Sequence, residues 1–505
     1  MVRSICLLLV FLSYSASEDC FAQPGTLDPS FGTGGFAECC LFGINDDEFI
    51  DLVVQSDGKI IGGGYMDNGT NMDFALARYS SLGTIDPTFD SDGLVVTDFS
   101  GNDDYGLSLV QQSDGKLILC GYSEGGATID IVLARYNTDG SLDNSFDADG
   151  KRVIDVGASD EWAYGVTLQS DGKIVIAGVH NNGDNNVLVI RLNSDGTNDT
   201  SFDTDGIVIT DGGASYEGGY ALAMQSDGKI IVAGYSDGGP TDDFFIARYT
   251  ASGLLDATFD LEGVLTFDSG SDESAFTVLV QPDNKIIAAG YNYLATTKLA
   301  VLRCNSDGSL DNTFDSDGWL ATNVAGNQAE AYSIAIQTDD KIVLCGDGWI
   351  GTGDADICLV RLNANGSFDS GFDTDGCVIT DCSTGDDVAW NMAIDGDEKI
   401  VLAGSSTVTN SNGIIARYLI DSTGDISGSY RDDILRIFPN PSQETVTLLW
   451  SEAASSEITI FNSLGQAILT DFIENEYTIS GLASGHYLAM ISSEGNIVRE
   501  NFVVE

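Results

Sequence analysis

Short apolar runs separated by polar turns fill most of this chain. The runs are rich in Val and Ile and are bounded by Asp, Asn, Ser and Gly. Such a pattern is typical of β-strands, and it shows no 3.6-residue helical period. In one representative stretch it predicts four strands, at residues 153–156, 164–169, 173–177 and 187–192.

A hairpin turn lies between the second and third of these strands, and it recurs along the chain. The stretch Gln169-Ser170-Asp171-Gly172-Lys173 places Asp-Gly between two apolar runs, which is the strongest short hairpin signal. We expect a type I′ turn, in which both central residues take positive φ. The lysine that ends the turn returns with a period of 56 to 58 residues, at Lys59, Lys116, Lys173, Lys229, Lys285, Lys341 and Lys399.

Two further positions repeat with the same period. A glycine follows each lysine by five residues, always after a small residue, which predicts close approach of a neighbouring strand or sheet. A phenylalanine anchors each unit, at Phe31, Phe89, Phe146, Phe202, Phe259, Phe314 and Phe372. Seven such units of four strands predict an all-β fold, a seven-bladed β-propeller over residues 23–419. A right-handed parallel β-solenoid is the competing architecture, but the hairpins favour antiparallel blades.

The repeated blocks resemble a known family. They read Leu-Asp-x-x-Phe-Asp-x-Asp-Gly, Gln-x-Asp-Gly-Lys-Ile and Ala-Arg-Tyr-Asn-x-Asp-Gly, and they cover residues 25–419. This combination is similar to the delta-60 repeat of the DUF5122 type, a family of secreted bacterial repeats. The resemblance implies β-propeller blades and carries no activity with it.

The two ends of the chain differ from the repeats. Residues 1–22 have the basic start, short apolar run and final small residue of a secretory signal peptide, and the run is too short to span a membrane. No other segment is long and apolar enough for a transmembrane helix. Residues 420–433 have the composition of a linker. Alternating strands and Gly/Asn turns over residues 434–505 predict a small Ig-like β-sandwich.

The C-terminal segment carries its own resemblance. Its Phe-Pro-Asn-Pro opening (438–441), its Asn-Ser-Leu-Gly-Gln turn (462–466) and its Leu-x-x-Gly-x-Tyr block (482–487) are similar to the type A sorting domain of the type IX secretion system of Bacteroidota. The resemblance implies that residues 434–505 bind the type IX secretion machinery. It places the protein outside a Gram-negative cell, secreted or on the outer-membrane surface. The final strand departs from the family by carrying Arg499-Glu500 and ending in Glu505, where a more basic tail is usual, which bears on anchoring.

Charge narrows the choice of partners. The chain has 78 acidic and 21 basic residues, a net charge of −57. Such a field repels nucleic acid and anionic membranes, and it favours solubility and uptake of cations.

An acidic turn follows the phenylalanine in six of the units. Closely spaced carboxylates before a glycine are the way in which loops wrap oxygen ligands around calcium, the cofactor we consider here. The candidate ligands are Asp90, Asp92, Asp147, Asp149, Asp203, Asp205, Asp315, Asp317, Asp373 and Asp375. Asp and Gly are also ordinary turn residues, and the first unit has Gly32 and Gly34 instead, so structural turns are the alternative reading.

A repeated arginine and a few cysteines complete the polar inventory. Each unit has an arginine, such as Arg135, which we expect to form an inter-strand or inter-blade ion pair, with Asp130 five residues earlier among the nearby acids. A ring of ligand-binding arginines is the alternative.

Most cysteines occupy apolar positions. Cys39 and Cys40 do not, and we expect one of them to form a disulfide with Cys382 that closes the ring.

The sequence offers no catalytic constellation. Its two histidines, His180 and His486, lie in different domains, which argues against a histidine-based triad or metal centre. No unit carries an acid pair that differs from the others, so we expect no enzyme. The leading hypothesis is a surface-displayed binding or adhesion scaffold for a glycan or protein ligand. Its ligand would lie on the variable loops 66–72, 122–128, 180–185, 236–242 and 347–354. A polysaccharide-acting enzyme and a structural cell-surface component are the alternatives.

Overall fold

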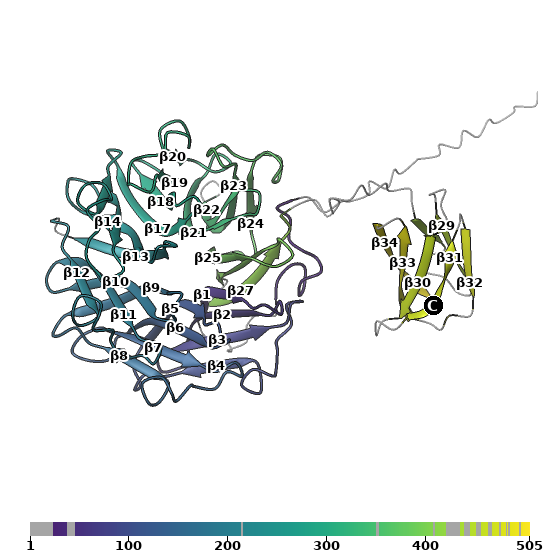
Figure 1. Ribbon diagram of the computed structural model, residues 1–505, viewed down its shortest axis with the longest axis horizontal. Helices are drawn as coiled ribbons and strands as arrows, with labels where there is room; N and C mark the ends of the chain where they lie inside the picture. The colour runs from purple at the N-terminus through teal and green to yellow at the C-terminus, as the bar shows by residue number, and fades with distance from the viewer. Residues whose placement is uncertain are drawn as a thin grey trace, which may run out of the picture. The chain divides into compact units, whose positions relative to one another are not determined.

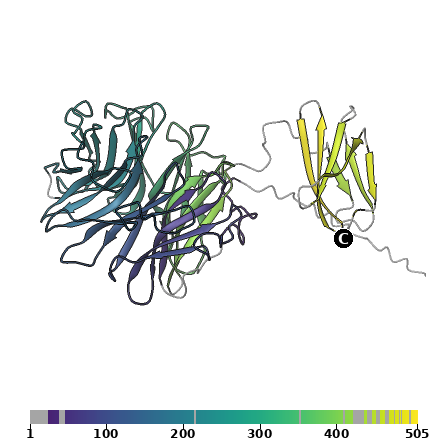
Figure 2. The same ribbon diagram turned by 60° about the horizontal axis from the view of Figure 1, so that its bottom comes forward.

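The computed structural model describes two compact units, residues 22–420 and residues 421–505. Within them, the described residues are 24–37, 46–213, 216–349, 353–407, 410–420, 435–438, 445–450, 456–462, 467–473, 476–480, 482, 485–493 and 496–504. The first unit is a ring of sheets arranged around a central axis, and every described element is a β-strand (Figures 1 and 2). The all-β, seven-bladed propeller is therefore confirmed, and the β-solenoid is not formed.

Six blades of the ring are complete four-stranded antiparallel sheets in which the strands follow the order of the chain. Their strands are β1 (Asp47–Val54), β2 (Ile60–Asp67), β3 (Met72–Tyr79) and β4 (Leu94–Thr97); β5 (Asp104–Gln111), β6 (Leu117–Ser123), β7 (Asp130–Tyr136) and β8 (Lys151–Ile154); β9 (Asp160–Leu168), β10 (Ile174–Asn181), β11 (Asn185–Leu192) and β12 (Ile207–Thr210); β13 (Glu217–Met224), β14 (Ile230–Ser236), β15 (Asp243–Tyr249) and β16 (Val264–Phe267); β17 (Asp272–Val280), β18 (Ile286–Tyr293), β19 (Thr297–Cys304) and β20 (Trp319–Thr322); β21 (Gln328–Ile336), β22 (Ile342–Trp349), β23 (Ala355–Leu362) and β24 (Cys377–Thr380). The first strand of each sheet is the innermost strand of its blade.

The seventh blade is built from both ends of the propeller. It contains β25 (Asp387–Ile394), β26 (Ile400–Thr407) and β27 (Ser411–Tyr418). Residues 24–37, the N-terminal strap, run along the free edge of β27. The amide of Ala37 donates to the carbonyl of Ile415 at 2.9 Å, and the amide of Asp28 donates to that of Arg417 at 2.7 Å. The strap thus takes the place of a fourth strand in this blade. Each sequence repeat therefore contains the last strand of one blade and the first three strands of the next blade.

The hairpin between the first and second strands has a different turn from the one we expected. The amide of Gly58 donates to the carbonyl of Gln55 at 2.9 Å, and the amide of Gln55 donates to that of Lys59 at 2.8 Å. Gly58 has a φ of 80°, whereas Asp57 is not among the positive-φ residues. The turn is therefore a three-residue loop with one left-handed residue, not a two-residue type I′ turn. This arrangement also accommodates Glu398 at the equivalent position, with a φ of 60°.

The repeated glycine makes the predicted close approach. A Cβ atom on Gly178 would lie 1.9 Å from the carbonyl oxygen of Trp162 on the paired strand β9. The six equivalent glycines are equally crowded, at 1.8 to 2.1 Å from a carbonyl oxygen. Each lies where the innermost strand forms a β-bulge, so an unpaired residue is inserted at that point. The glycine allows the bulge, and the bulge redirects a side chain toward the axis of the ring.

The repeated arginine ties neighbouring blades together. In the second blade the Arg135 guanidinium pairs with Asp143 at 2.7 Å, and Lys116 reaches the same carboxylate at 2.8 Å. Arg135 also donates to the carbonyl of Ser194 in the next blade and lies over the ring of Phe146. The seven sets are Arg78–Asp86–Lys59, Arg135–Asp143–Lys116, Arg191–Asp199–Lys173, Arg248–Asp256–Lys229, Arg303–Asp311–Lys285, Arg361–Asp369–Lys341 and Arg417–Asp28–Lys399.

We expected each repeated arginine to form an ion pair, and it does. Its partner is the aspartate of the Leu-Asp-x-x-Phe block, such as Asp143 for Arg135, and not the acid five residues before the arginine. In the seventh set that aspartate is Asp28 of the strap. The cysteines at apolar positions are buried, as expected, at Cys120, Cys304, Cys345, Cys358 and Cys377. Cys39 and Cys40 lie outside the described residues, so their pairing with Cys382 stays a prediction.

The C-terminal unit contains two sheets. One joins β28 (Leu435–Phe438), β29 (Thr445–Trp450) and β32 (Glu476–Ser480), and the other joins β30 (Ser456–Asn462), β31 (Ala467–Ile473), β33 (Gly485–Ser493) and β34 (Asn496–Val504). Its Ig-like character stays a prediction. Nowhere in the described part of the chain is there a helix with the length and apolarity needed to cross a membrane.

Candidate functional site

The central axis of the propeller holds a cavity of about 800 Å³. Its wall is formed by the innermost strands of all seven blades, β1, β5, β9, β13, β17, β21 and β25, which surround the axis in Figure 1. None of the described residues that line it is Lys or Arg. The seven bulge residues all line the cavity, because the bulge leaves them without a cross-strand partner; they are Ile50, Leu107, Tyr164, Tyr220, Phe276, Tyr332 and Trp390.

Aromatic rings from neighbouring blades touch one another around this cavity. Along one side the ring centroids follow at 5.0 Å from Tyr164 to Tyr220, 5.8 Å to Phe276, 5.3 Å to Tyr332 and 4.9 Å to Trp390. On the other side Tyr105 lies 5.0 Å from Tyr65 and 5.1 Å from Tyr122. We call these eight residues the aromatic collar. It presents large apolar surfaces with hydroxyl groups at their edges, a combination that suits amphipathic ligands.

Two acidic groups stand beside the collar. Glu48 lines the cavity, and burial raises the pKa of its carboxyl group above the usual value. In the sixth blade Glu330 and Asp347 are directly opposed across β21 and β22. The Tyr332 hydroxyl donates to Glu330 at 3.0 Å, and burial, together with the charge of Glu330, raises the pKa of Asp347 to about 7.

A further acid, Asp51, also lines the cavity. It accepts hydrogen bonds from the Asn391 side chain at 2.6 Å, from the Leu109 amide at 2.6 Å and from the Ser108 hydroxyl at 3.2 Å. Burial nevertheless raises its pKa to about 6. Because Asn391 and Ser108 belong to the two neighbouring blades, Asp51 joins three blades at the seam of the ring.

The aspartates of the predicted calcium turns accept hydrogen bonds from backbone amides within the same turns. The Asp92 carboxylate accepts a hydrogen bond from the Leu94 amide at 3.0 Å, and Asp149, Asp205, Asp317 and Asp375 accept the equivalent bond. The partner aspartates Asp90, Asp147, Asp203, Asp315 and Asp373 take positive φ, between 41° and 44°. These contacts account for the aspartates as turn residues, and calcium at the turns stays a prediction.

Other predicted site residues lie elsewhere than expected. His180 was placed in a variable loop, but it lies in strand β10, buried, with its Nδ1 atom 2.9 Å from Glu161. It therefore makes a contact inside the blade and not on a loop. The proposed ligand loops connect the second and third strands of their blades, and several of their residues belong to those strands.

Sequence reasoning missed the collar and the acid pair. A signal was present: the residue five positions before the Gln or Asp that opens the hairpin turn is aromatic in five of the seven units. Asp347 was also visible as a departure, because four other units place tyrosine at the equivalent position, as in Tyr65 and Tyr235. The bulge that aims these residues at one cavity could not be read from strand periodicity.

Together the seven sheets, their closure and the axial cavity define a β-propeller with an aromatic centre. The chain carries the DUF5122 β-propeller domain, whose function is unknown, at residues 55–89, 112–146, 169–202, 225–259, 281–314 and 337–372. It also carries the secretion system C-terminal sorting domain at residues 436–505. This domain directs export by the type IX system to the cell surface or the extracellular space.

Solved structures give distant likenesses. The extracellular domain of a hybrid two-component system from B. thetaiotaomicron is 12% identical, with a TM-score of 0.41, over 92% of this chain and 56% of that one, so the chain spans little more than half of that protein. Polysaccharide lyase Uly1 is 10% identical, with a TM-score of 0.45, over 75% of this chain and 91% of that one. A protein of unknown function from Dyadobacter fermentans is 11% identical, with a TM-score of 0.38, over 78% and 97%. No curated protein matches the chain.

Proposed function

We propose that the protein is a binding scaffold, displayed outside the cell, that takes a neutral or amino-substituted glycan into its central cavity. The aromatic collar is the observation that carries this proposal. Sugar rings present flat C–H faces that stack on aromatic rings, and their hydroxyl groups find partners in the tyrosine hydroxyls and in Glu48. The volume of about 800 Å³ falls within the usual range for small-ligand sites.

Charge selects among glycans. The cavity has acids at its wall and no lysine or arginine among its described lining residues, and the whole chain carries −57. Uronate-rich or sulfated polymers would be repelled, whereas neutral and amino sugars would not. We therefore place the ligand on the axis of the ring and not on the outer loops. Adhesion of the cell to a surface that bears the glycan is the role that this site and the export route support.

A glycan array with the full chain tests the proposal. We expect binding to neutral or amino glycans, reduced about 5- to 30-fold by Tyr220→Ala or Tyr332→Ala, because a lost stacking partner costs roughly 1–2 kcal/mol. Tyr293→Ala is the matched control, since this tyrosine is 46% exposed and does not line the cavity. Binding that survives both collar variants, or a blank array with protein shown folded by circular dichroism, would reject the central site.

The acid pair of the sixth blade favours one second candidate, cleavage of a polysaccharide. Burial and the neighbouring Glu330 raise the pKa of Asp347 to about 7, burial also raises the pKa of Glu330, and the pair therefore shares a proton near neutral pH. A protonated acid beside an ionised one is the arrangement that glycoside hydrolysis requires. Release of reducing ends from the array ligands, abolished by Asp347→Asn and Glu330→Gln with binding retained, would establish this activity. Binding without turnover would leave the scaffold role alone.

A further inference from the structure

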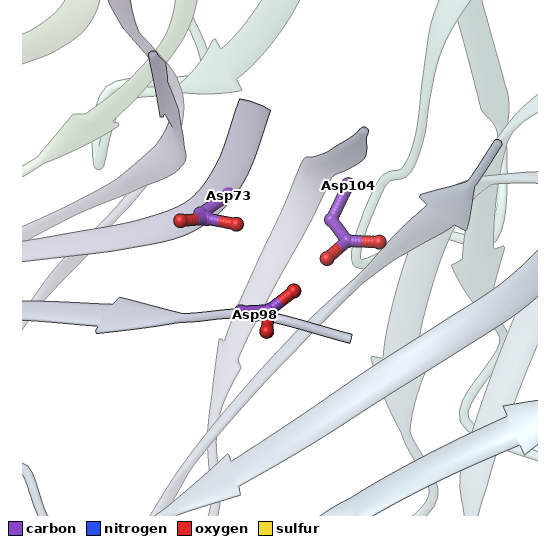
Figure 3. A group of neighbouring side chains, drawn as sticks. All are labelled: Asp73, Asp98 and Asp104. Atoms are coloured by element: carbon purple, nitrogen blue, oxygen red, sulfur yellow. The ribbon is translucent and has the colours of Figure 1, made fainter. Parts of the chain in front are cut away.

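Three carboxylates meet at four of the seven junctions between neighbouring blades. In each group one oxygen from every member lies within 4.8 Å of the others. The groups are Asp73–Asp98–Asp104, Asp130–Asp155–Glu161, Asp243–Asp268–Glu273 and Asp356–Asp381–Asp387. Figure 3 shows the first of them, with the three carboxylates facing a common space. We call these groups the junction triads.

All four triads are built in the same way. Asp73 lies at the start of β3, Asp98 follows the end of β4, and Asp104 opens β5 of the next blade. The same three places supply the members of the other triads. Each triad therefore joins two blades, and none of its members belongs to the acidic turns or to the arginine sets.

The geometry leaves buried oxygen atoms without a partner. Asp104 is fully buried, and its Oδ1 atom makes no hydrogen bond to any described residue. Asp243, the counterpart of Asp73 in the third triad, is 9% exposed, and its Oδ1 atom also has no hydrogen-bond partner among the described residues. Burial raises the pKa of both carboxyl groups to about 6, and neighbouring carboxylates act in the same direction.

Ion pairs with lysine or arginine do not relieve this concentration of charge. Among the described ion pairs, none joins a lysine or an arginine to a triad carboxylate; the Lys151 ammonium donates to the backbone carbonyl of Asp98 at 3.0 Å, and the Nδ1 atom of His180 lies 2.9 Å from Glu161. Unpaired buried carboxylates are costly, and proteins normally pair them with a cation or use them to coordinate a metal.

The remaining junctions act as an internal comparison. Between the fifth and sixth blades the three places hold Lys298, Asn323 and Ala329, so a lysine takes the first place and both acids are gone. Between the third and fourth blades Asn186 replaces the first acid and two acids remain. The junction that has a lysine at the first of the three places therefore lacks both of the other acids.

We propose that each junction triad binds one hard divalent cation, with calcium preferred, and that the four ions brace the ring between blades. Calcium binds oxygen at about 2.3–2.6 Å, so two oxygens on one ion lie no more than about 5 Å apart, as the triad oxygens do. The ion lies between segments of two blades, with waters completing its shell. Calcium is favoured over magnesium because magnesium demands near-ideal octahedral geometry and gives up its water reluctantly.

Equilibrium dialysis of the full chain with radioactive calcium at millimolar concentration tests the inference. We expect four ions per chain, and three after Asp98→Asn. Asp98 is exposed, so this variant keeps the buried members in place. Asp211→Asn is the matched control: it removes the same charge from the equivalent exposed place at a junction without a triad. Asp92→Asn removes the same charge from an acidic turn. Both controls should still bind four ions.

A gain-of-function variant tests the inference in the opposite direction, with circular dichroism as the check on folding because Ala329 is fully buried. Lys298→Asp, Asn323→Asp and Ala329→Asp together should create a fifth site. An equal loss of calcium in all three single variants would show diffuse binding by the acidic surface and would overturn the inference. So would the absence of calcium uptake, or uptake that Asp98→Asn leaves at four ions.

Discussion

Replacement of Asp28 by asparagine tests how the ring is closed. Asp28 is 3% exposed, and its Oδ2 atom lies 2.7 Å from the Lys399 ammonium and 2.9 Å from the Arg417 guanidinium. Its Oδ1 atom accepts from the Ser30 hydroxyl at 2.6 Å. Asparagine can keep the contact with Ser30, but it removes the only charge that the strap offers to both cations among the described ion pairs.

The expected magnitude follows from what is left behind. Removing one partner of a buried ion pair costs about 3–5 kcal/mol, because the other charge stays buried and unpaired. Lys399 is partly exposed and turns to water, so its share is small. Arg417 is 6% exposed and cannot turn to water, and the one other carboxylate paired with it among the described residues, Asp395, is 3.9 Å away and compensates only weakly. We therefore expect Asp28→Asn to lower the free energy of unfolding of the propeller by about 3–4 kcal/mol.

Urea unfolding of the full chain measures the loss, and limited proteolysis with chymotrypsin reports on the strap, which contains the buried Phe31. Asp143→Asn is the matched control, since it breaks the same kind of set inside a complete blade. Both variants should lose similar stability, but only Asp28→Asn should expose the strap to cleavage. A loss below about 1 kcal/mol, or a strap equally protected in both variants, would refute the reasoning.

Three further predictions concern pH, the crowded glycine and the cysteines. Burial raises the pKa values of the seven paired aspartates, but their hydrogen bonds and the charges of the arginines lower them by more. Each pKa is therefore held below its usual value, at about 2 for Asp86. The stability that these ion pairs contribute should be lost as pH falls below about 4. Asp51 and Asp347 have raised pKa values, so their ionisation should lower stability as pH rises from about 4 to 7. The free energy of unfolding, measured by chemical unfolding across pH, should therefore have a maximum near pH 4–5. A flat profile would contradict this. Gly178→Ala should destabilise strongly because its Cβ would overlap a backbone oxygen, whereas Gly396→Ala meets nothing within 4 Å and should change the unfolding midpoint little; equal midpoints would disprove the packing argument. Non-reducing peptide mapping should recover Cys382 joined to Cys39 or Cys40, and a free thiol at Cys382 in all molecules would end that expectation.

The blades could be predicted because their signals are local. The hairpin turn and the crowded glycine lie within ten residues of each other, and the period multiplies them seven times. The turn type was wrong because Asp-Gly serves both a two-residue turn and a three-residue loop, and only the backbone of Asp57 and Gly58 separates them.

The sites were harder because they combine distant segments. The collar depends on bulges, and a bulge shifts every later side chain without leaving a mark in the hydrophobic pattern. Asp73 and Asp104 are 31 residues apart and belong to different blades. In a chain with 78 acids, such a spacing does not stand out until the sheets are placed side by side.

The strap also sets the order in which the molecule is completed. Asp28 and Arg417 are separated by 389 residues, so the last blade cannot form until nearly the whole propeller has been made. Until then β27 presents an unpaired edge, which is a template for any free strand of matching sequence. A strap from a second copy fits that edge as well as its own does. Two chains that meet before their straps have docked can therefore exchange straps, and docking of each strap on its own β27 removes the edge that permits the exchange.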